Sequence, residues 1–294
     1  MRVIGIIFLI AVLASCKKVN LDGLAFPSEK LESYAFENAE GEIIVDDSIL
    51  ATSDNYTLLT FNSVDANTGE SFEIYGVFIG DTATIATDTL IVYFHGQSKH
   101  MDHYFGRASL LANVGGKYNY NVVMMDYRGY GMSEGTSTEQ GLFEDADAVI
   151  DWIKAKGADP QKTVFYGYSL GAIPSIDRTA YRSDFQPAKL IIEAPLASVE
   201  YLVHSSTVIQ VDPDFVTNLD FENAEKIKDV DEPLLWMHGV EDTYVAIENG
   251  EIIYNNHGGS LKWAERVEGS DHSEVPIVMG IDVYLEKVLG FIRN

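Results

Sequence analysis

The sequence predicts an α/β fold, in which a doubly wound, mostly parallel sheet carries helices on both faces. From residue 89 onward, short apolar runs of strand length alternate with longer segments of helical periodicity. That alternation is typical of a parallel sheet covered by helices. Before residue 89, two strand-like runs flank the turn-forming segment 65–70 (DANTGE), which indicates a hairpin. We therefore expect an antiparallel pair of strands at the edge of the sheet.

The predicted elements follow one another without a break after residue 55. The expected strands span 57–61, 71–79, 90–94, 121–125, 163–166, 190–192, 234–237 and 261–267. The expected helices span 103–113, 139–156, 170–181, 246–255 and 275–292. No internal repeat and no domain boundary interrupts this series. Residues 56–294 are therefore expected to form one α/β domain, a length sufficient for a complete core.

The first sixteen residues resemble a bacterial lipoprotein signal peptide. Arg2 supplies a positive charge, residues 3–12 form a short apolar core, and small residues precede Cys16, the only cysteine of the chain. The resemblance implies removal of residues 1–15, attachment of lipid to Cys16, and export to the bacterial cell envelope with a membrane anchor. An ordinary secretory signal, or an uncleaved anchor in which the cysteine is incidental, remains an alternative. Residues 16–55 lack periodicity and are expected to form a tether and an irregular extension.

The composition argues against several classes of function. The chain has 294 residues, a formal net charge of −25 and an isoelectric point of about 4.4. Nucleic-acid binding is not expected, because neutralising phosphates requires a basic face. The mean hydropathy of −0.01 is that of a soluble globular protein. No group of histidine and acidic residues has metal-ligand spacing, so we expect no metal. Export would remove the protein from the internal supply of ATP and NAD, so we expect no cofactor.

A G-x-S-x-G motif at 167–171 (GYSLG) directly follows the expected strand 163–166. A serine at such a sharp strand-to-helix turn has a strained backbone and an exposed hydroxyl, and small residues must flank it. The amides of the helix that follows face the position where an oxyanion would develop. The motif alone also occurs by chance as a glycine–serine turn. Its position after a strand favours Ser169 as a nucleophile.

A nucleophilic serine needs a base, an acid that orients the base, and an oxyanion hole. Candidates occur in the chain order Ser, Asp, His that a doubly wound hydrolase uses. Asp242 follows the next-to-last expected strand and is the candidate acid, with Glu241 as its competitor. His272 follows the last expected strand and is the candidate base. His257 is its rival, in a segment that reads as a helix-ending turn.

Two backbone amides are expected to form the oxyanion hole. One belongs to Leu170, the residue after the nucleophile, and the other should come from the loop after strand 90–94. In that loop Gly96 permits close approach of the backbone, and Gln97 is the candidate donor. His95 and His238 stand beside glycines at strand ends, where a structural role in the turn is the better interpretation.

Together with the turn 126–135 (DYRGYGMSEG), these segments resemble the α/β-hydrolase superfamily. The similarity covers roughly residues 70–292 and is greatest to the lidless branch of esterases, thioesterases and serine-aminopeptidase-like enzymes. In the turn, Arg128 is interpreted as a scaffold residue that ties down the loop. The resemblance implies Ser169 as nucleophile, Asp242 as acid, His272 as base, and Gln97 and Leu170 as oxyanion donors.

The sequence departs from the family pattern in the oxyanion loop, where the bulky segment 97–100 (QSKH) would narrow an acyl pocket. Fewer than forty residues separate Pro195 from Pro233, which is too few for a large lid domain. We expect a serine hydrolase that acts on a small-molecule or acyl-bearing ester or thioester. A serine peptidase of the aminopeptidase kind and a non-catalytic binding module on the same fold remain alternatives.

Overall fold

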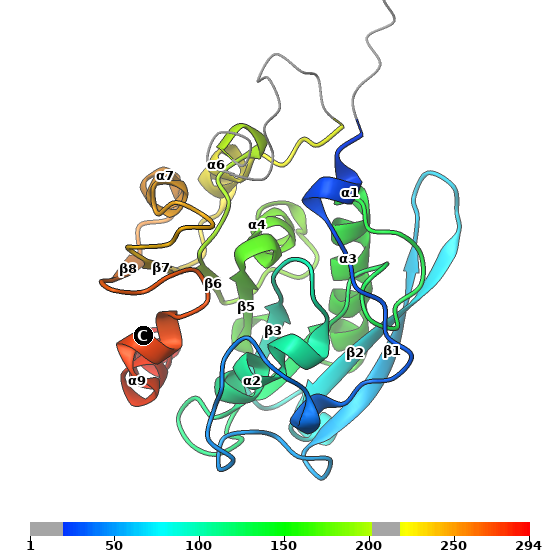
Figure 1. Ribbon diagram of the computed structural model, residues 1–294, viewed down its shortest axis with the longest axis horizontal. Coiled ribbons are helices and arrows are strands. Elements are labelled where there is room, and N and C mark those ends of the chain that lie inside the picture. The colour runs from blue at the N-terminus through cyan, green and yellow to red at the C-terminus, as the bar shows by residue number, and fades with distance from the viewer. Residues whose placement is uncertain (1–19, 202–217) are drawn as a thin grey trace, which may run out of the picture.

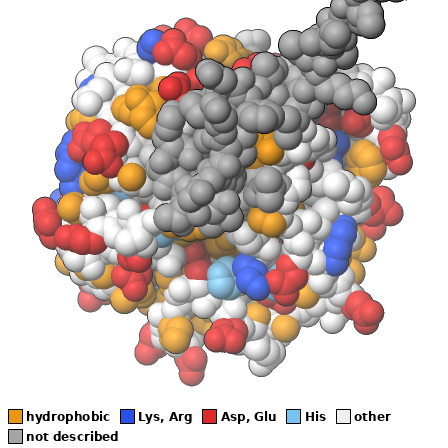
Figure 2. All heavy atoms as spheres, turned by 45° about the horizontal axis from the view of Figure 1, so that its top comes forward, with side chains coloured by type: hydrophobic (Ala, Val, Ile, Leu, Met, Phe, Trp, Pro, Cys, Tyr) orange, Lys and Arg blue, Asp and Glu red, His pale blue; other side chains and the backbone are white. Residues whose placement is uncertain are grey.

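The computed structural model describes residues 20–201 and 218–294 (Figure 1). The expected signal peptide and its Cys16 lie outside the described residues. Within the described residues, no helix combines the length and the apolarity needed to cross a bilayer. Acidic side chains are spread over the face of the molecule that Figure 2 shows, in keeping with the net charge of −25.

An eight-stranded sheet forms the centre of the molecule, in the order β1-β2-β4-β3-β5-β6-β7-β8. β1 and β2 are antiparallel to each other, β2 is antiparallel to β4, and all neighbouring pairs from β4 to β8 are parallel. The predicted fold class is therefore confirmed. The strands are β1 (Tyr56–Val64), β2 (Ser71–Ile79), β3 (Leu90–Phe94), β4 (Asn121–Met125), β5 (Thr163–Tyr168), β6 (Lys189–Glu193), β7 (Leu234–Gly239) and β8 (Lys262–Val267).

Helices cover both faces of the sheet (Figure 1). One hydrophobic cluster joins the sheet to α3, α4 and α7, and a second joins its other face to α2, α8 and α9. The single helix predicted over 275–292 is wrong, because Gly280 adopts a φ of 88° and separates α8 from α9. The helices are α1 (Asp22–Ala25), α2 (Met101–Ala112), α3 (Glu139–Ala155), α4 (Ala172–Tyr181), α6 (Asn223–Lys226), α7 (Glu248–Asn256), α8 (Val275–Met279) and α9 (Ile281–Arg293), and the short 3₁₀ turns are η1 (Phe36–Asn38), η2 (Thr82–Thr84), η3 (Pro160–Lys162), η4 (Ser169–Gly171) and η5 (Ile227–Asp229).

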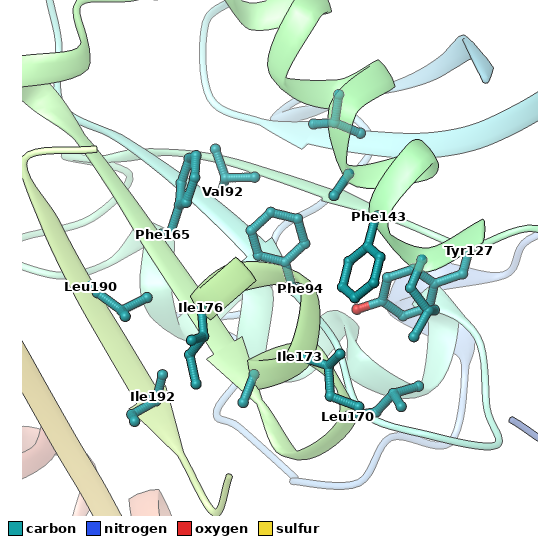
Figure 3. Close-up of a cluster of buried hydrophobic side chains, with 14 of the residues drawn as sticks. Val92, Phe94, Tyr127, Phe143, Phe165, Leu170, Ile173, Ile176, Leu190 and Ile192 are labelled. Carbon is teal, nitrogen blue, oxygen red and sulfur yellow. The ribbon is translucent and has the colours of Figure 1, made fainter. Parts of the chain in front are cut away.

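The central strands read as continuous apolar runs because both of their faces are buried. Figure 3 shows Phe94 of β3, Phe165 of β5 and Ile192 of β6 among the side chains of one cluster, with Ile173 and Ile176 of α4. All five are at most 1 % exposed, and each such burial contributes roughly 1.5–3 kcal/mol. This packing fixes the ends of β5 and β6, from which the candidate site is built.

The described part of the N-terminal extension is largely irregular, and it packs against the domain. Phe36, Ile43 and Ala51 are buried in the cluster that contains α2. The carboxylate of Asp102 in α2 accepts hydrogen bonds from the backbone amides of Ala35 and Phe36, at 2.8 and 2.9 Å. Periodicity cannot reveal this packing, because single apolar residues, rather than a helical or strand face, fill the gaps. Glu42, in the same extension, lines a cavity at the candidate site.

Candidate active site

Ser169 stands at the turn between β5 and α4, in a strained backbone conformation with a φ of 51°. The flanking glycines are required by close contacts: a Cβ atom at Gly171 would overlap the carbonyl oxygen of Phe94, and one at Gly167 would overlap the hydroxyl of Ser175. A non-glycine residue in this region of φ, ψ space carries roughly 1–3 kcal/mol of strain. The turn therefore holds Ser169 at the carboxyl edge of the sheet at the expense of local stability.

The structure brings the three candidate catalytic side chains into one hydrogen-bonded chain. Ser169 Oγ lies 2.9 Å from His272 Nε2, and His272 Nδ1 lies 2.7 Å from Asp242 Oδ2. The residues follow β5, β8 and β7, whose carboxyl ends lie at the same edge of the parallel sheet. In the tautomer that satisfies all three groups, His272 Nδ1–H donates to Asp242 and Nε2 accepts from Ser169. That is the arrangement in which an imidazole can take the serine proton.

Asp242 is held as an anion by its surroundings. Its side chain is buried, and its Oδ1 accepts backbone N–H groups from Tyr244 and Val245 at 2.9 and 2.7 Å. Burial acts to raise the pKa of Asp242, but the hydrogen bonds from His238 and His272 outweigh it and hold the pKa well below its usual range. Glu241, the competing acid, instead accepts the backbone N–H of Gly269 at 2.5 Å.

His238 supports Asp242 at the same carboxylate oxygen that His272 contacts. Its Nδ1 accepts the indole N–H of Trp236 at 3.3 Å, so the proton of the neutral ring belongs on Nε2. Nε2 lies 2.9 Å from the carbonyl oxygen of Val245 and 3.2 Å from Asp242 Oδ2. Sequence reasoning assigned His238 to the turn alone. Its spacing of four residues from Asp242 gave no signal, because the contact depends on how the loop folds back after β7.

The two candidate oxyanion donors belong to the turn after β5 and to the loop after β3. Leu170 is the second residue of η4, and the first amides of a helix have no partner within it. Gln97 is anchored through its other polar groups: Tyr104 Oη donates to its carbonyl oxygen at 2.7 Å, Tyr244 Oη donates to its Oε1 at 2.5 Å, and its Nε2 donates to the carbonyl oxygen of Ala25. No described residue accepts from the backbone N–H of Gln97. That amide remains available to a ligand.

Arg107 of α2 underlies the site, and sequence reasoning missed it. This fully buried guanidinium lies 2.6 Å from Glu42 and 2.6 Å from Glu193, and donates to the carbonyl oxygen of Ser273 at 3.0 Å. It also lies 4.3 Å from the ring centre of Tyr168. Burial acts to lower the pKa of Arg107, but the two carboxylates hold it well above its usual value. Arg107 thus joins the residue before the nucleophile to the residue after His272.

Two cavities meet at Ser169. The larger has a volume of about 380 Å³ and is lined largely by polar residues that include Glu42, Asp271 and His272. The smaller has a volume of about 20 Å³ and is lined mostly by apolar residues that include Leu170 and Leu196. The predicted absence of a large lid concerns segment 195–233, of which residues 202–217 lie outside the described part.

The remaining histidines named from the sequence do not reach Ser169. His257 ends α7, and its Nε2 lies 2.9 Å from the carbonyl oxygen of Glu232. His95 is fully buried, and its Nε2 lies 3.1 Å from Asp126. Across residues 20–201 and 218–294 no three His, Cys, Asp or Glu side chains are grouped as metal ligands would be.

Comparison with known proteins places these observations in a family context. The family model described as "Serine aminopeptidase, S33" matches residues 86–223. Among curated proteins, lysophosphatidylserine lipase ABHD12 of Mus musculus is 31% identical over 191 residues, which are 60% of this chain and 47% of that protein. Human alpha/beta hydrolase domain-containing protein 17B is 28% identical over 209 residues, which are 69% of this chain and 66% of that protein. The chain thus spans about half the length of the first relative and just under two thirds of the second.

Solved structures agree on the fold. The esterase Pf2001 of Pyrococcus furiosus superposes with a TM-score of 0.64 at 16% identity, over 89% of this chain and 98% of that chain. Est1E of Butyrivibrio proteoclasticus, solved with ferulic acid bound, superposes with a TM-score of 0.63 at 16% identity, over 79% and 97%. The fold is that of the α/β hydrolases, and the family match and the curated relatives support the assignment of this chain to the α/β-hydrolase superfamily.

Proposed function

We propose that the protein is a serine hydrolase that cleaves carboxylic esters or thioesters through an acyl-enzyme. The observation that carries the proposal is the unbroken chain of hydrogen bonds from Ser169 through His272 to Asp242, at the meeting point of two cavities. The hydrolase relatives support the same reaction class. An oriented imidazole and a strained serine turn serve catalysis, and a binding module would need neither of them.

In the first step, Ser169 Oγ attacks the carbonyl carbon while His272 Nε2 takes its proton. The backbone amides of Gln97 and Leu170 donate to the carbonyl oxygen as it gains negative charge, and each such donor is typically worth roughly 3 kcal/mol in the transition state. His272 then returns the proton to the departing alcohol or thiol. In the second step, water gives a proton to His272 and attacks the acyl-enzyme. His272 then gives that proton to Ser169 Oγ as the bond to the acyl group breaks, which releases the acid and restores the serine hydroxyl. Asp242 stays ionised and keeps the imidazolium oriented.

A second candidate is a serine peptidase, which the description of the matching family model favours. The reaction would use the same side chains, with an amine in place of the alcohol. The two activities are separated by their substrates, because an aminopeptidase requires a free amino group beside the scissile bond.

We also propose that the mature chain is exported and anchored to a bacterial membrane by lipid on Cys16. The support is the arrangement of Arg2, the apolar segment 3–12 and the small residues before the cysteine. Such an anchor would place the hydrolase in the cell envelope.

The test of the proposed reaction compares wild type with Ser169→Ala on p-nitrophenyl acetate, an acetyl thioester and alanine p-nitroanilide. Hydrolysis of either acetyl compound that is lost in Ser169→Ala supports the esterase assignment, and preferred cleavage of the anilide supports the peptidase. Ser175→Ala is a matched control, because it removes a buried hydroxyl of the adjoining helix α4 that donates to the carbonyl oxygen of Ala172. Folded wild-type protein that is inactive on all three and unreactive with a fluorophosphonate would contradict the proposal.

A further inference from the structure

The two cavities at Ser169 differ in size and polarity, and a hydrogen bond separates them. Gln97, Ser169 and Tyr244 line both cavities. Tyr244 Oη donates to Gln97 Oε1 at 2.5 Å, and the ring of Tyr244 lies 5.0 Å from that of His272. The bonded pair forms a partition beside the nucleophile. A substrate bound at Ser169 therefore extends in two directions, one on each side of this partition.

The chemistry of the reaction decides which part of the substrate occupies which cavity. His272 must pass its proton to the leaving group, so the leaving group lies on the side of His272. His272 and the three neighbours Asp271, Ser273 and Glu274 all line the larger cavity, and none of them lines the smaller one. Leu170, an expected oxyanion donor, lines the smaller cavity and does not line the larger one. The acyl group is thus directed into the smaller cavity and the leaving group into the larger.

The smaller cavity accommodates only a short acyl group. A space of about 10–15 Å³ holds one water molecule. A cavity of about 20 Å³ is thus small, and we expect it to admit one or two carbon groups beyond the carbonyl. Its walls include Ile173 and Phe221, which are fully buried, and Leu196, which is 7 % exposed. These side chains belong to the core, so the cavity does not widen without loss of packing.

The larger cavity is lined by carboxylates and by no lysine or arginine among the described residues. Asp271 and Glu274 are close to His272 in the chain, and Glu42 belongs to the N-terminal extension. Burial lowers the pKa of His103, which keeps that ring neutral near pH 7. Arg107 lies beneath the cavity, where Glu42 and Glu193 already neutralise it. A phosphate or carboxylate in the leaving group would meet like charges here and find no cation.

We infer that the natural substrates are esters or thioesters of a short apolar acyl group, about two or three carbons long, with a larger polar leaving group that carries no negative charge. The inference rests on the proposed function and names the substrate class of the same site. It disfavours lysophospholipids, whose long acyl chain and phosphate fit neither cavity. It also disfavours N-terminal aminoacyl substrates, because no carboxylate among the described residues lines the smaller cavity to hold an ammonium group.

The first experiment varies the acyl group of p-nitrophenyl esters from acetate to decanoate. For wild type, kcat/KM is expected to fall at least tenfold between propionate and octanoate. Leu196→Ala enlarges the smaller cavity and should move the optimum to longer chains, whereas Ala25→Leu fills the cavity and should confine turnover to acetate. Two variants with opposite expected shifts keep the test decisive if one of them folds poorly, which circular dichroism would reveal.

The second experiment holds the acyl group as acetyl and varies the leaving group among glycerol, choline and glycerol 3-phosphate. The anionic ester is expected to have a kcat/KM at least tenfold below the neutral one, and the difference should shrink at high salt because charges at an open cavity are screened. Glu274→Gln should narrow the same difference and leave the acyl-length profile unchanged. Leu196→Ala should change the acyl-length profile and leave the difference between the anionic and neutral esters unchanged.

Fluorophosphonate labelling of every variant distinguishes failure of the substrate inference from failure of the proposed serine-hydrolase function. Labelled protein with equal activity on acetate and octanoate, or with equal activity on the anionic and neutral esters, would overturn the inference and leave the proposed function standing. Labelled protein in which Leu196→Ala changes leaving-group preference and Glu274→Gln changes acyl preference would also overturn it, because the two cavities would be assigned the wrong way round. Folded wild-type protein that is not labelled would overturn both.

Discussion

Replacing Asp242 by asparagine removes one charge and replaces one oxygen by an NH₂ group, at a site where every neighbour is a donor. Oδ2 lies 2.7 Å from His272 Nδ1 and 3.2 Å from His238 Nε2. Oδ1 accepts the backbone N–H groups of Tyr244 and Val245. The amide of an asparagine has a single acceptor oxygen, so its NH₂ group must face two donors in either orientation.

If the NH₂ group faces His272, the imidazole must turn its proton away from Nδ1, and Nε2 can then no longer accept from Ser169. Such a tautomer error is worth about 10⁴ in kcat in a well-studied serine protease, equivalent to ~5.5 kcal/mol of transition-state stabilisation. If the NH₂ group faces the two backbone amides, the buried groups left unsatisfied cost about 1–3 kcal/mol each in stability. We therefore expect Asp242→Asn to lose activity by about 10³- to 10⁴-fold.

The assay is kcat/KM for p-nitrophenyl acetate, with the thermal midpoint measured in parallel. Glu241→Gln is the matched control, because the neighbouring carboxylate bonds to Gly269 rather than to His272 and its loss should change kcat/KM by less than about threefold. A folded Asp242→Asn protein that keeps more than a tenth of wild-type kcat/KM would refute the reasoning. A larger loss in Glu241→Gln than in Asp242→Asn would show that the acid had been wrongly assigned.

The remaining predictions concern other parts of the site and the N-terminus. Stability should depend on pH through Asp242, because its folded pKa lies below the unfolded value of 3.8. The ionised carboxylate therefore stabilises the fold above about pH 4. In urea titrations, the difference in unfolding free energy between wild type and Asp242→Asn should shrink as the pH falls below about 4 toward the folded pKa. Arg107→Met leaves two buried carboxylates without a cation and should lower the free energy of unfolding by about 3–5 kcal/mol, whereas a change below 1 kcal/mol would mean that the network contributes little. Gly171→Ala forces a Cβ atom against the carbonyl oxygen of Phe94 and should abolish fluorophosphonate labelling at a cost of about 1–3 kcal/mol in stability; normal labelling would contradict the role given to this glycine. Cys16→Ser should move the protein from the membrane to the soluble fraction, and unchanged fractionation would argue against the lipid anchor.

The fold could be predicted because its strands carry strong local signals. The runs 90–94 and 121–125 match β3 and β4 at both ends, since strands buried on both faces are apolar throughout. The boundary errors have local causes. β7 extends to Gly239 because its last residues still pair with β8, although His238 and Gly239 do not read as strand residues.

The candidate site could be predicted in part, because Ser169, Asp242 and His272 each follow a strand and parallel strands end at one edge of a sheet. The supporting residues could not. Arg107 contacts Glu42, Glu193 and Ser273, which are far from it in the sequence, and no periodicity encodes such contacts. The contact of Tyr244 could not be predicted for the same reason, since its hydrogen bond to Gln97 joins loops 147 residues apart.

The central claim is that Ser169 is an activated nucleophile, and intact-mass spectrometry after treatment with a fluorophosphonate tests it most directly. We expect a single phosphonyl adduct on wild type, mapped to Ser169 by peptide analysis, and slow or absent labelling in Ser169→Ala and His272→Ala. Folded wild-type protein that gains no adduct, or that carries it on another serine while Ser169→Ala is labelled at the same rate, would contradict the account.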